Sequence, residues 1–188
     1  MDRTQLLQNF ETLAETPEAV AKLRAFILDL AIRGRLVSQV AEVAPFTGEF
    51  AIKHPDCEMK NIYTAPPKCK WLLLSQVASL IRGVSHRKDE ASETSEPGYV
   101  PVLRANNIGK GLNFDDLIYV RRANVTAEQL IKRHDVLIAM SSGSKNLVGK
   151  AAQAESDFDG GFGAFCGLIR LVVQLHPQYL GLFLQTPF

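Results

Sequence analysis

Apolar residues recur at helical spacing near the start of the chain. Within residues 1–36, two apolar series follow the period of an amphipathic helix, and Thr16-Pro17 separates them. Thr16 suits the position before a helix, and Pro17 suits its first turn, which needs no N–H donor. Gly34 after Arg33 fits a left-handed helix end. The pattern predicts two helices forming an αα-hairpin; the two series are Leu6, Leu7, Phe10, Leu13 and Ala14, then Val20, Leu23, Ile27, Leu30 and Ala31.

Regular spacing is lost in the next part of the chain. Four prolines interrupt residues 41–70, so we expect an irregular connector there. Order returns at Trp71, and residues 74–78 predict a short helix that leads into Leu80-Ile81-Arg82-Gly83. The polar, charged stretch 86–98 predicts a mobile loop.

Five short apolar runs separated by turn-forming residues follow, and they predict strands. The expected strands cover residues 99–104, 117–120, 135–140, 147–154 and 164–173. Thr126 and Gln129 have the spacing of a capping box, which predicts a short helix over 127–132, and Pro177 begins a last apolar helix. Strands separated by loops and short helices indicate an α+β domain with a mixed or antiparallel sheet.

Composition narrows the class of protein without fixing its function. The chain has 188 residues, of which 46% are hydrophobic, and a formal net charge of +1, as in a globular protein with one core. We expect no membrane span, because no run of 18 apolar residues exists, and no secretory signal. The three cysteines are too few for a disulfide framework, so we expect a cytoplasmic protein.

Local charge is less even than the total. Residues 59–88 hold six bases and no acid, and residues 121–150 hold six bases against Glu128 and Asp135. If the two stretches share a face, that face suits a polyanion. Charge alone favours the other interpretation, an ordinary solvated surface.

Two glycine-rich motifs fail in their spacing. Residues 143–150 resemble a phosphate-binding loop, but five residues rather than four separate the glycines, and Ala151 cannot bind magnesium. Gly161-Phe162-Gly163 begins a dinucleotide fingerprint that lacks its third glycine. A flexible turn before a strand is the better interpretation of this second motif.

No metal site or catalytic motif is complete either. His54, Cys57 and Cys69 offer zinc-type ligands without a fourth, so Cys69 and Cys166 are expected to act as small hydrophobic residues. The paired acids Asp115-Asp116 and Asp157/Asp159 flank strands, where acids serve as turn formers. We therefore expect no catalytic residue, no metal and no cofactor.

An ordered series of segments carries the strongest signal. After Trp71, Leu74 and Val77-Ala78, these segments are IRGVS at 81–85, YVPVLRANNI at 99–108, HDVLIA at 134–139, SSGS at 141–144 and VGK at 148–150. Together they resemble the target-recognition domain of type I restriction-modification specificity (S) subunits. In that family a G…Y-x-P-x-L-R-x-x-N-I strand precedes G-D-V-L-I-A-x-S-G-S, and "a-F" comes later. His134 replaces the usual glycine, and one serine of Ser141-Ser142 is extra; both departures fall in turns.

The N-terminal helices resemble the helical conserved region of the same subunits. The matching residues are Phe10, Leu13, Val20, Lys22-Leu23-Arg24, Ile27-Leu28, Ala31, Arg33-Gly34 and Leu36-Val37. The resemblance implies a helical docking and spacing region at 1–40 and a DNA-binding recognition domain at 71–188. It also implies a non-catalytic subunit whose partners are duplex DNA, modification subunits that methylate adenine, and a restriction subunit that cuts DNA.

A DNA-recognition domain of this kind needs polar loops on a rigid sheet, and arginine or lysine side chains that bind the phosphates. The candidate DNA contacts are Arg82, Ser85, Arg87, Lys88, Arg104, Asn106, Asn107, Ser142, Ser144, Lys145 and Asn146. Each group has a structural alternative. Asn106 and Asn107 suit left-handed turns, residues 141–144 suit a plain hairpin connection, and Arg104 suits an internal ion pair, for example with Asp135.

The family carries two recognition domains and two helical regions, whereas this chain carries one of each. Three interpretations follow: a fragment, which we favour, a disrupted gene product, or a half-subunit that forms a homodimer and reads a palindromic site. The alternative function is a protein-interaction module that docks modification subunits without productive DNA binding.

Overall fold

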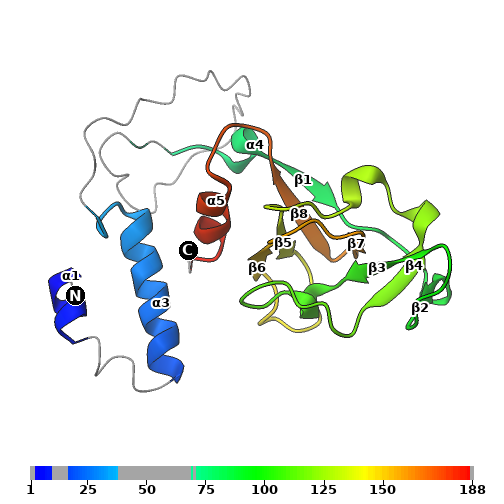
Figure 1. Cartoon of the computed structure of the whole chain (residues 1–188), viewed down its shortest axis with the longest axis horizontal. Helices are drawn as coiled ribbons and strands as arrows, with labels where there is room; N and C mark the ends of the chain where they lie inside the picture. The colour runs from blue at the N-terminus through cyan, green and yellow to red at the C-terminus, as the bar shows by residue number, and fades with distance from the viewer. Residues whose placement is uncertain (1–2, 10–16, 38–68, 70, 187–188) are drawn as a thin grey trace. The chain divides into compact units, whose positions relative to one another are not determined.

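The computed structural model describes residues 3–9, 17–37, 69 and 71–186 (Figure 1). The chain divides into two compact units, Met1–Gln76 with Thr186–Phe188, and Val77–Gln185. Among the described residues, no helix is long and apolar enough to cross a membrane.

The first unit contains the two predicted helices, α1 (Arg3–Gln8) and α3 (Pro17–Ile32). Helix α3 begins at Pro17, and Gly34 has a φ of +64° in the left-handed region, both as predicted. Leu23 and Leu30 of the predicted apolar series are buried, whereas Val20 is 49% exposed. The predicted cap Thr16 lies outside the described residues, so the joint of the hairpin stays a prediction.

The expected connector at 41–70 also lies outside the described residues, apart from Cys69. The Cys69 side chain is exposed, which does not support its predicted role as a small hydrophobic residue. The predicted short helix after Trp71 is present as α4 (Leu74–Val77).

The second unit consists of two four-stranded sheets, with α5 (Pro177–Leu184) beside β6 (Figure 1). The strands are β1 (Ala78–Arg82), β2 (Ala91–Ser92), β3 (Tyr99–Leu103), β4 (Ile118–Arg121), β5 (Val136–Ala139), β6 (Ala151–Gln153), β7 (Gly161–Phe162) and β8 (Cys166–Leu171). The first sheet has the order β1-β8-β5-β6 and is antiparallel throughout. The second has the order β2-β4-β3-β7, with β3 and β7 parallel. The predicted α+β class with a mixed or antiparallel sheet is confirmed.

All five predicted strands are present, as β3, β4, β5, β6 and β8. Strand β6 begins at Ala151 rather than at residue 147, because residues 140–150 form a loop. The helix predicted at 127–132 is a single 3-10 turn, Ala127–Gln129, and Gln129 Oε1 accepts the Thr126 N–H at 3.0 Å as the capping box requires.

Three strands were not predicted. Strand β1 follows α4 directly, and its side chains at Leu80 and Arg82 are exposed, so it lacks a clear alternation. Strand β2 lies within the stretch 86–98 that was predicted as a mobile loop. The flexible turn predicted at Gly161-Phe162 is wrong, because these two residues are the buried strand β7.

A single apolar cluster joins the two sheets. Leu103 and Phe162 of the second sheet pack in one cluster with Leu137, Cys166 and Leu168 of the first. These side chains are fully buried, and each large one contributes about 2 kcal/mol of burial free energy. Burial raises the pKa of the Cys166 thiol to about 11, which fits its predicted role as a small hydrophobic residue.

A buried ion pair ties strand β8 to the turn before β5. Arg170 Nη2 donates to Asp135 Oδ2 at 2.6 Å and Arg170 Nε to Asp135 Oδ1 at 2.9 Å, and Asp135 is 3% exposed. Arg170 also donates to the carbonyls of Glu128 and Leu130, and the Lys132 N–H donates to Asp135. The hydrogen bond to Asp135 raises the pKa of Arg170. Asp135 is therefore paired inside the domain.

His134 occupies a left-handed backbone position. Its φ is +74°, its N–H donates to Ala154 O at 2.8 Å, and its carbonyl accepts a hydrogen bond from Gln153 Nε2 at 3.0 Å. These hydrogen bonds hold the backbone in a conformation that a Cβ disfavours. A glycine, which the resemblance leads one to expect at this position, would adopt this conformation without strain.

We expect His134→Gly to raise the free energy of unfolding by about 0.5–1 kcal/mol, because it removes left-handed strain that outweighs the added chain entropy. Urea unfolding would measure it. Gly98→Ala is the matched control: Gly98 has a φ of +80° and open space around its Cβ position, so the variant should lose about 1 kcal/mol. A destabilised His134→Gly variant would contradict the strain argument.

We expect Arg170→Met to lower the free energy of unfolding by about 3 kcal/mol, because it leaves a buried carboxylate unpaired. The control is Arg122→Met, which breaks the exposed Arg122–Asp159 ion pair of 2.6 Å and should cost less than about 1 kcal/mol. Equal shifts of the two urea midpoints would contradict a larger contribution of the Arg170–Asp135 pair to stability.

Candidate nucleic-acid interface

The three groups of candidate residues start beside one stretch of backbone, residues 161–167, which we name the central segment. It contains β7, a turn and the start of β8. The contacts are backbone hydrogen bonds: Val84 N–H to Phe162 O (2.7 Å), Gly163 N–H to Leu103 O (2.9 Å), and Met140 and Ser141 N–H to Phe165 O (2.9 and 3.0 Å). The three candidate segments, which are far apart in the sequence, therefore all begin next to the central segment.

A glycine makes this convergence possible. A Cβ on Gly83 would lie 2.1 Å from the Gly163 carbonyl oxygen, so no side chain fits at that position. The two backbone segments lie side by side here, since Val84 forms a parallel bridge with Gly163, and only a glycine allows so close an approach. The glycine in the IRGVS segment is thus a requirement of packing.

The first group begins at Arg82, the last residue of β1, and continues beyond the strand. The side chains of Arg82, Ser85, Arg87 and Lys88 are exposed, and no ion pair involves them within the part of the chain that the structure describes. The Arg82 carbonyl accepts a hydrogen bond from Gln129 Nε2 at 3.0 Å, which fixes the backbone at the start of the group. These bases are available to an anionic partner.

The second group follows β3, and its three side chains make contacts within the domain. Arg104 Nη2 pairs with Asp116 Oδ2 at 2.9 Å, so Arg104 does form an internal ion pair, although its partner is Asp116 and not Asp135. Asn107 is 1% exposed; its Oδ1 accepts the Arg104 N–H and its Nδ2 donates to the Asp115 carbonyl, both at 2.8 Å. A base pair cannot reach this amide, so the proposed interface excludes Asn107.

Asn106 is the exposed member of the second group. Its Nδ2 lies 3.3 Å from Asp116 Oδ2, and its backbone belongs to a right-handed 3-10 turn, Ala105–Asn107. The left-handed geometry considered for Asn106 and Asn107 is wrong; among the described residues other than glycine, only Asp116 and His134 have a positive φ.

The third group lies in the loop that joins β5 to β6. Ser142 Oγ accepts the Ser144 N–H at 3.1 Å, and Lys145 and Asn146 are exposed. The loop does connect two antiparallel neighbours, as the hairpin alternative required. Because a strand follows it, this loop differs from a phosphate-binding loop, which a helix must follow.

The basic residues of stretch 121–150 lie before and after β5. Lys132 and Arg133 precede β5, whereas Lys145 and Lys150 follow it, about 13 Å further along a four-residue strand. Arg122 is paired with Asp159. The shared basic face considered from the sequence stays a prediction; Lys60, Lys68 and Lys70 lie outside the described residues.

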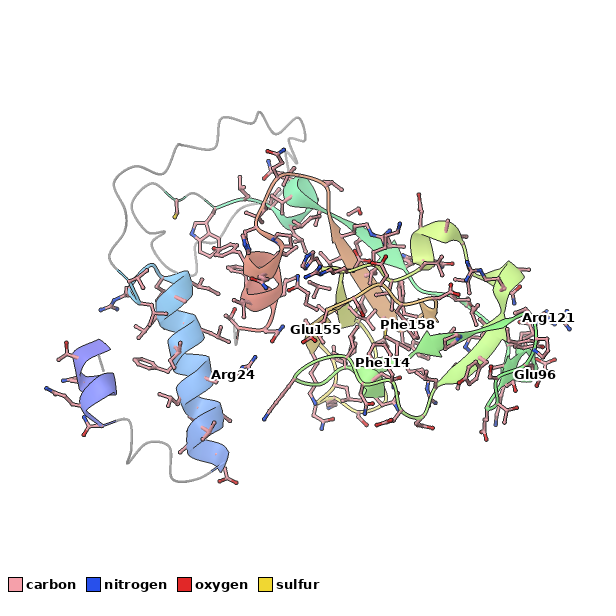
Figure 2. The ribbon with its side chains drawn as sticks, in the orientation of Figure 1. Arg24, Glu96, Phe114, Arg121, Glu155 and Phe158 are labelled. Carbon is pink, nitrogen blue, oxygen red and sulfur yellow. The ribbon has the colours of Figure 1, made fainter. Side chains whose placement is uncertain are left out.

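Arg121 lies at the far end of the second sheet, near β2 and Glu96 (Figure 2). Its Nε donates to the Tyr99 hydroxyl at 3.4 Å, and this contact raises the pKa of Arg121. Elsewhere in the domain, the rings of Phe114 and Phe158 pack with centroids 5.0 Å apart (Figure 2). Neither feature belongs to the central segment.

Three of the paired acids make contacts with residues distant in the sequence, so their predicted role as turn formers stays a prediction. Asp116 holds Arg104, and Asp157 Oδ1 accepts the Arg133 N–H at 2.8 Å. Within the described ranges, no three His, Cys, Asp or Glu side chains come close enough to hold a metal ion.

One residue of the central segment, Phe165, was not among the candidates predicted from the sequence. Its side chain is 69% exposed, the largest value among the big hydrophobic residues that the structure describes. An apolar residue beside a strand suggests burial, but the "a-F" of the family pattern was a signal that could have drawn attention to it.

Comparisons with known proteins match these features. No family model matches the chain. It is 43% identical over 117 residues to the StySPI type I restriction enzyme specificity subunit of Salmonella potsdam, covering 61% of this chain and 25% of that protein. It is 45% identical over 104 residues to the EcoKI type I restriction enzyme specificity subunit of Escherichia coli K12, covering 53% of this chain and 22% of that protein.

The fold has a solved counterpart in the HsdS subunit from Thermoanaerobacter tengcongensis. The TM-score is 0.51 at 20% identity, over 97% of this chain and 40% of that one. The predicted resemblance is confirmed: the chain is similar to specificity subunits of type I restriction enzymes. It spans about a quarter of the length of the curated relatives that it matches.

We expect Asn107→Ala to lower the free energy of unfolding by about 2 kcal/mol, because it leaves the Arg104 N–H and the Asp115 carbonyl without their partner. Asn106→Ala is the matched control and should change stability by less than about 0.5 kcal/mol. Urea unfolding of both variants would measure the difference. Equal stability of the two variants would contradict the assignment of Asn107 to the scaffold.

Proposed function

We propose that the Val77–Gln185 unit binds duplex DNA sequence-specifically, as the recognition part of a type I restriction specificity subunit. One observation carries the proposal. In a chain similar to such subunits, exposed arginine and lysine side chains without ion pairs lie in segments that begin beside the central segment. Arginine and lysine side chains that contact phosphates position a protein on DNA, and neighbouring polar side chains bind the edges of the nucleobases. The groups after β1 and β5 supply both kinds of side chain.

The proposed contacts fall into two classes. Arg82, Arg87, Lys88 and Lys145 hold phosphates, and the neighbouring polar side chains contact base edges; these are Ser85, Asn106, Ser142, Ser144 and Asn146. Arg104 and Asn107 support this surface from below through Asp116 and the Asp115 carbonyl. A rigid support of this kind keeps polar readers in register with a duplex.

The remainder of the proposed role concerns partners. The chain acts without catalysis of its own, in the cytoplasm, and directs adenine methylation and DNA cleavage by modification and restriction subunits. Its helical region at 1–40 docks these subunits and sets the spacing between half-sites. If the chain works as a half-subunit, a homodimer supplies the second recognition domain.

A salt titration tests DNA binding. With a random-sequence duplex pool, log K of the purified chain should fall with log salt between about 50 and 200 mM, with a slope near −3.6, or about −0.9 for each of four phosphates. Lys145→Ala should weaken the slope by about 0.9. The matched control, Lys132→Ala, changes an exposed lysine before β5 and should leave the slope unchanged.

A flat salt response, or equal slopes for the two lysine variants, would contradict the proposed surface. A chain that binds modification subunits but no DNA would instead be the docking module considered from the sequence.

A further inference from the structure

Phe165 stands at the tip of a tight turn in the central segment. The Cys166 N–H donates to the Gly163 carbonyl at 2.9 Å and closes the turn, and the Phe165 carbonyl accepts both N–H groups that begin the β5–β6 loop. Cys166 itself is fully buried in the core. The backbone of Phe165 is therefore fixed on both sides while its ring is 69% exposed.

Exposure alone does not indicate a binding role for Phe165, because single exposed apolar residues are common on protein surfaces. Val172 shows this: it is 62% exposed just beyond the other end of β8, away from every candidate group. Phe165 differs in position. It belongs to the central segment, whose backbone contacts Val84 within the first candidate group and the residues just before the other two groups.

We infer that Phe165 makes an apolar contact with a thymine methyl group in the major groove, an inference that rests on the proposed DNA binding. An aromatic ring offers neither a charge nor a hydrogen-bond donor to a phosphate, so the complement of the Phe165 ring on DNA is a base edge. The thymine methyl is the apolar group that the major groove presents. Phe165 is thus a specificity-determining residue that reads one A·T pair.

The ring suits this contact because little freedom is lost when it binds. Two hydrogen bonds to its carbonyl and one across its turn already fix the backbone, and a phenyl side chain has only two rotatable bonds. A contact made from a fixed backbone discriminates between bases better than one made from a mobile loop.

The test begins with selection of preferred duplexes from a random-sequence pool by the purified full chain. On the preferred duplex, Phe165→Ala should lower the affinity roughly tenfold and leave the slope of log K against log salt unchanged. Val172→Ala, the matched control, should change neither quantity. A lysine variant has the opposite signature, because it changes the slope.

Replacement of each thymine in the preferred duplex by uracil removes one methyl group at a time. At one position this change should weaken binding by the wild-type chain severalfold and have no effect on Phe165→Ala, because the contact is already lost. Equal affinities of Phe165→Ala and the wild type, or a uracil effect that persists in the variant at every position, would overturn the inference. Failure of the wild-type chain to bind the pool at all would overturn the proposed function itself.

Discussion

The buried pair between Asp135 and Arg170 sets the geometry on which the rest of the recognition unit depends. A carboxylate at 3% exposure is stable only when its oxygens are matched, and here Arg170 and one backbone N–H match them. The pair fixes the register of β5 against β8, with Val136 opposite Ile169. Three residues further along, the same register places Ala139 opposite Cys166, at the start of the candidate surface.

The central segment connects this pair of strands to the second sheet. Its β7 part pairs with β3 in the second sheet, and its β8 part pairs with β1 and β5 in the first. Phe162 and Cys166, four positions apart in the chain, share the apolar cluster that joins the sheets. The surface proposed for DNA is therefore anchored in the same residues that stabilise the fold.

Sequence patterns predicted those parts in which local preference and burial agree. The strands that became β3, β5 and β8 alternate or run apolar because they are buried, and the turn at Thr126 carries its own cap. Strand β1 was missed because its outer side chains are exposed, and β2 and β7 because two residues carry no period. Long-range pairing decides such short strands, and a single sequence does not contain it.

The candidate site was predictable to a similar extent. The motifs located the three groups, but they did not distinguish Asn106 from its buried neighbour Asn107, since adjacent asparagines differ only in which way a 3-10 turn directs them. The partner of Arg104 depends on Asp116, whose left-handed backbone the sequence does not reveal. Phe165 was overlooked because hydrophobicity alone suggests an interior place.

The close pairing of Gly83 with Gly163 has an evolutionary consequence. The loop at 140–150 can accept insertions or substitutions without disturbing this pairing, since the loop only begins at the central segment. A one-residue insertion between Gly163 and Cys166 would instead shift the Phe165 carbonyl, and with it the start of that loop, relative to the contacts that Phe162 and Gly163 make with the other two groups. New binding preferences should therefore arise by exchange of the outer loops, and the short turn between them should keep its length.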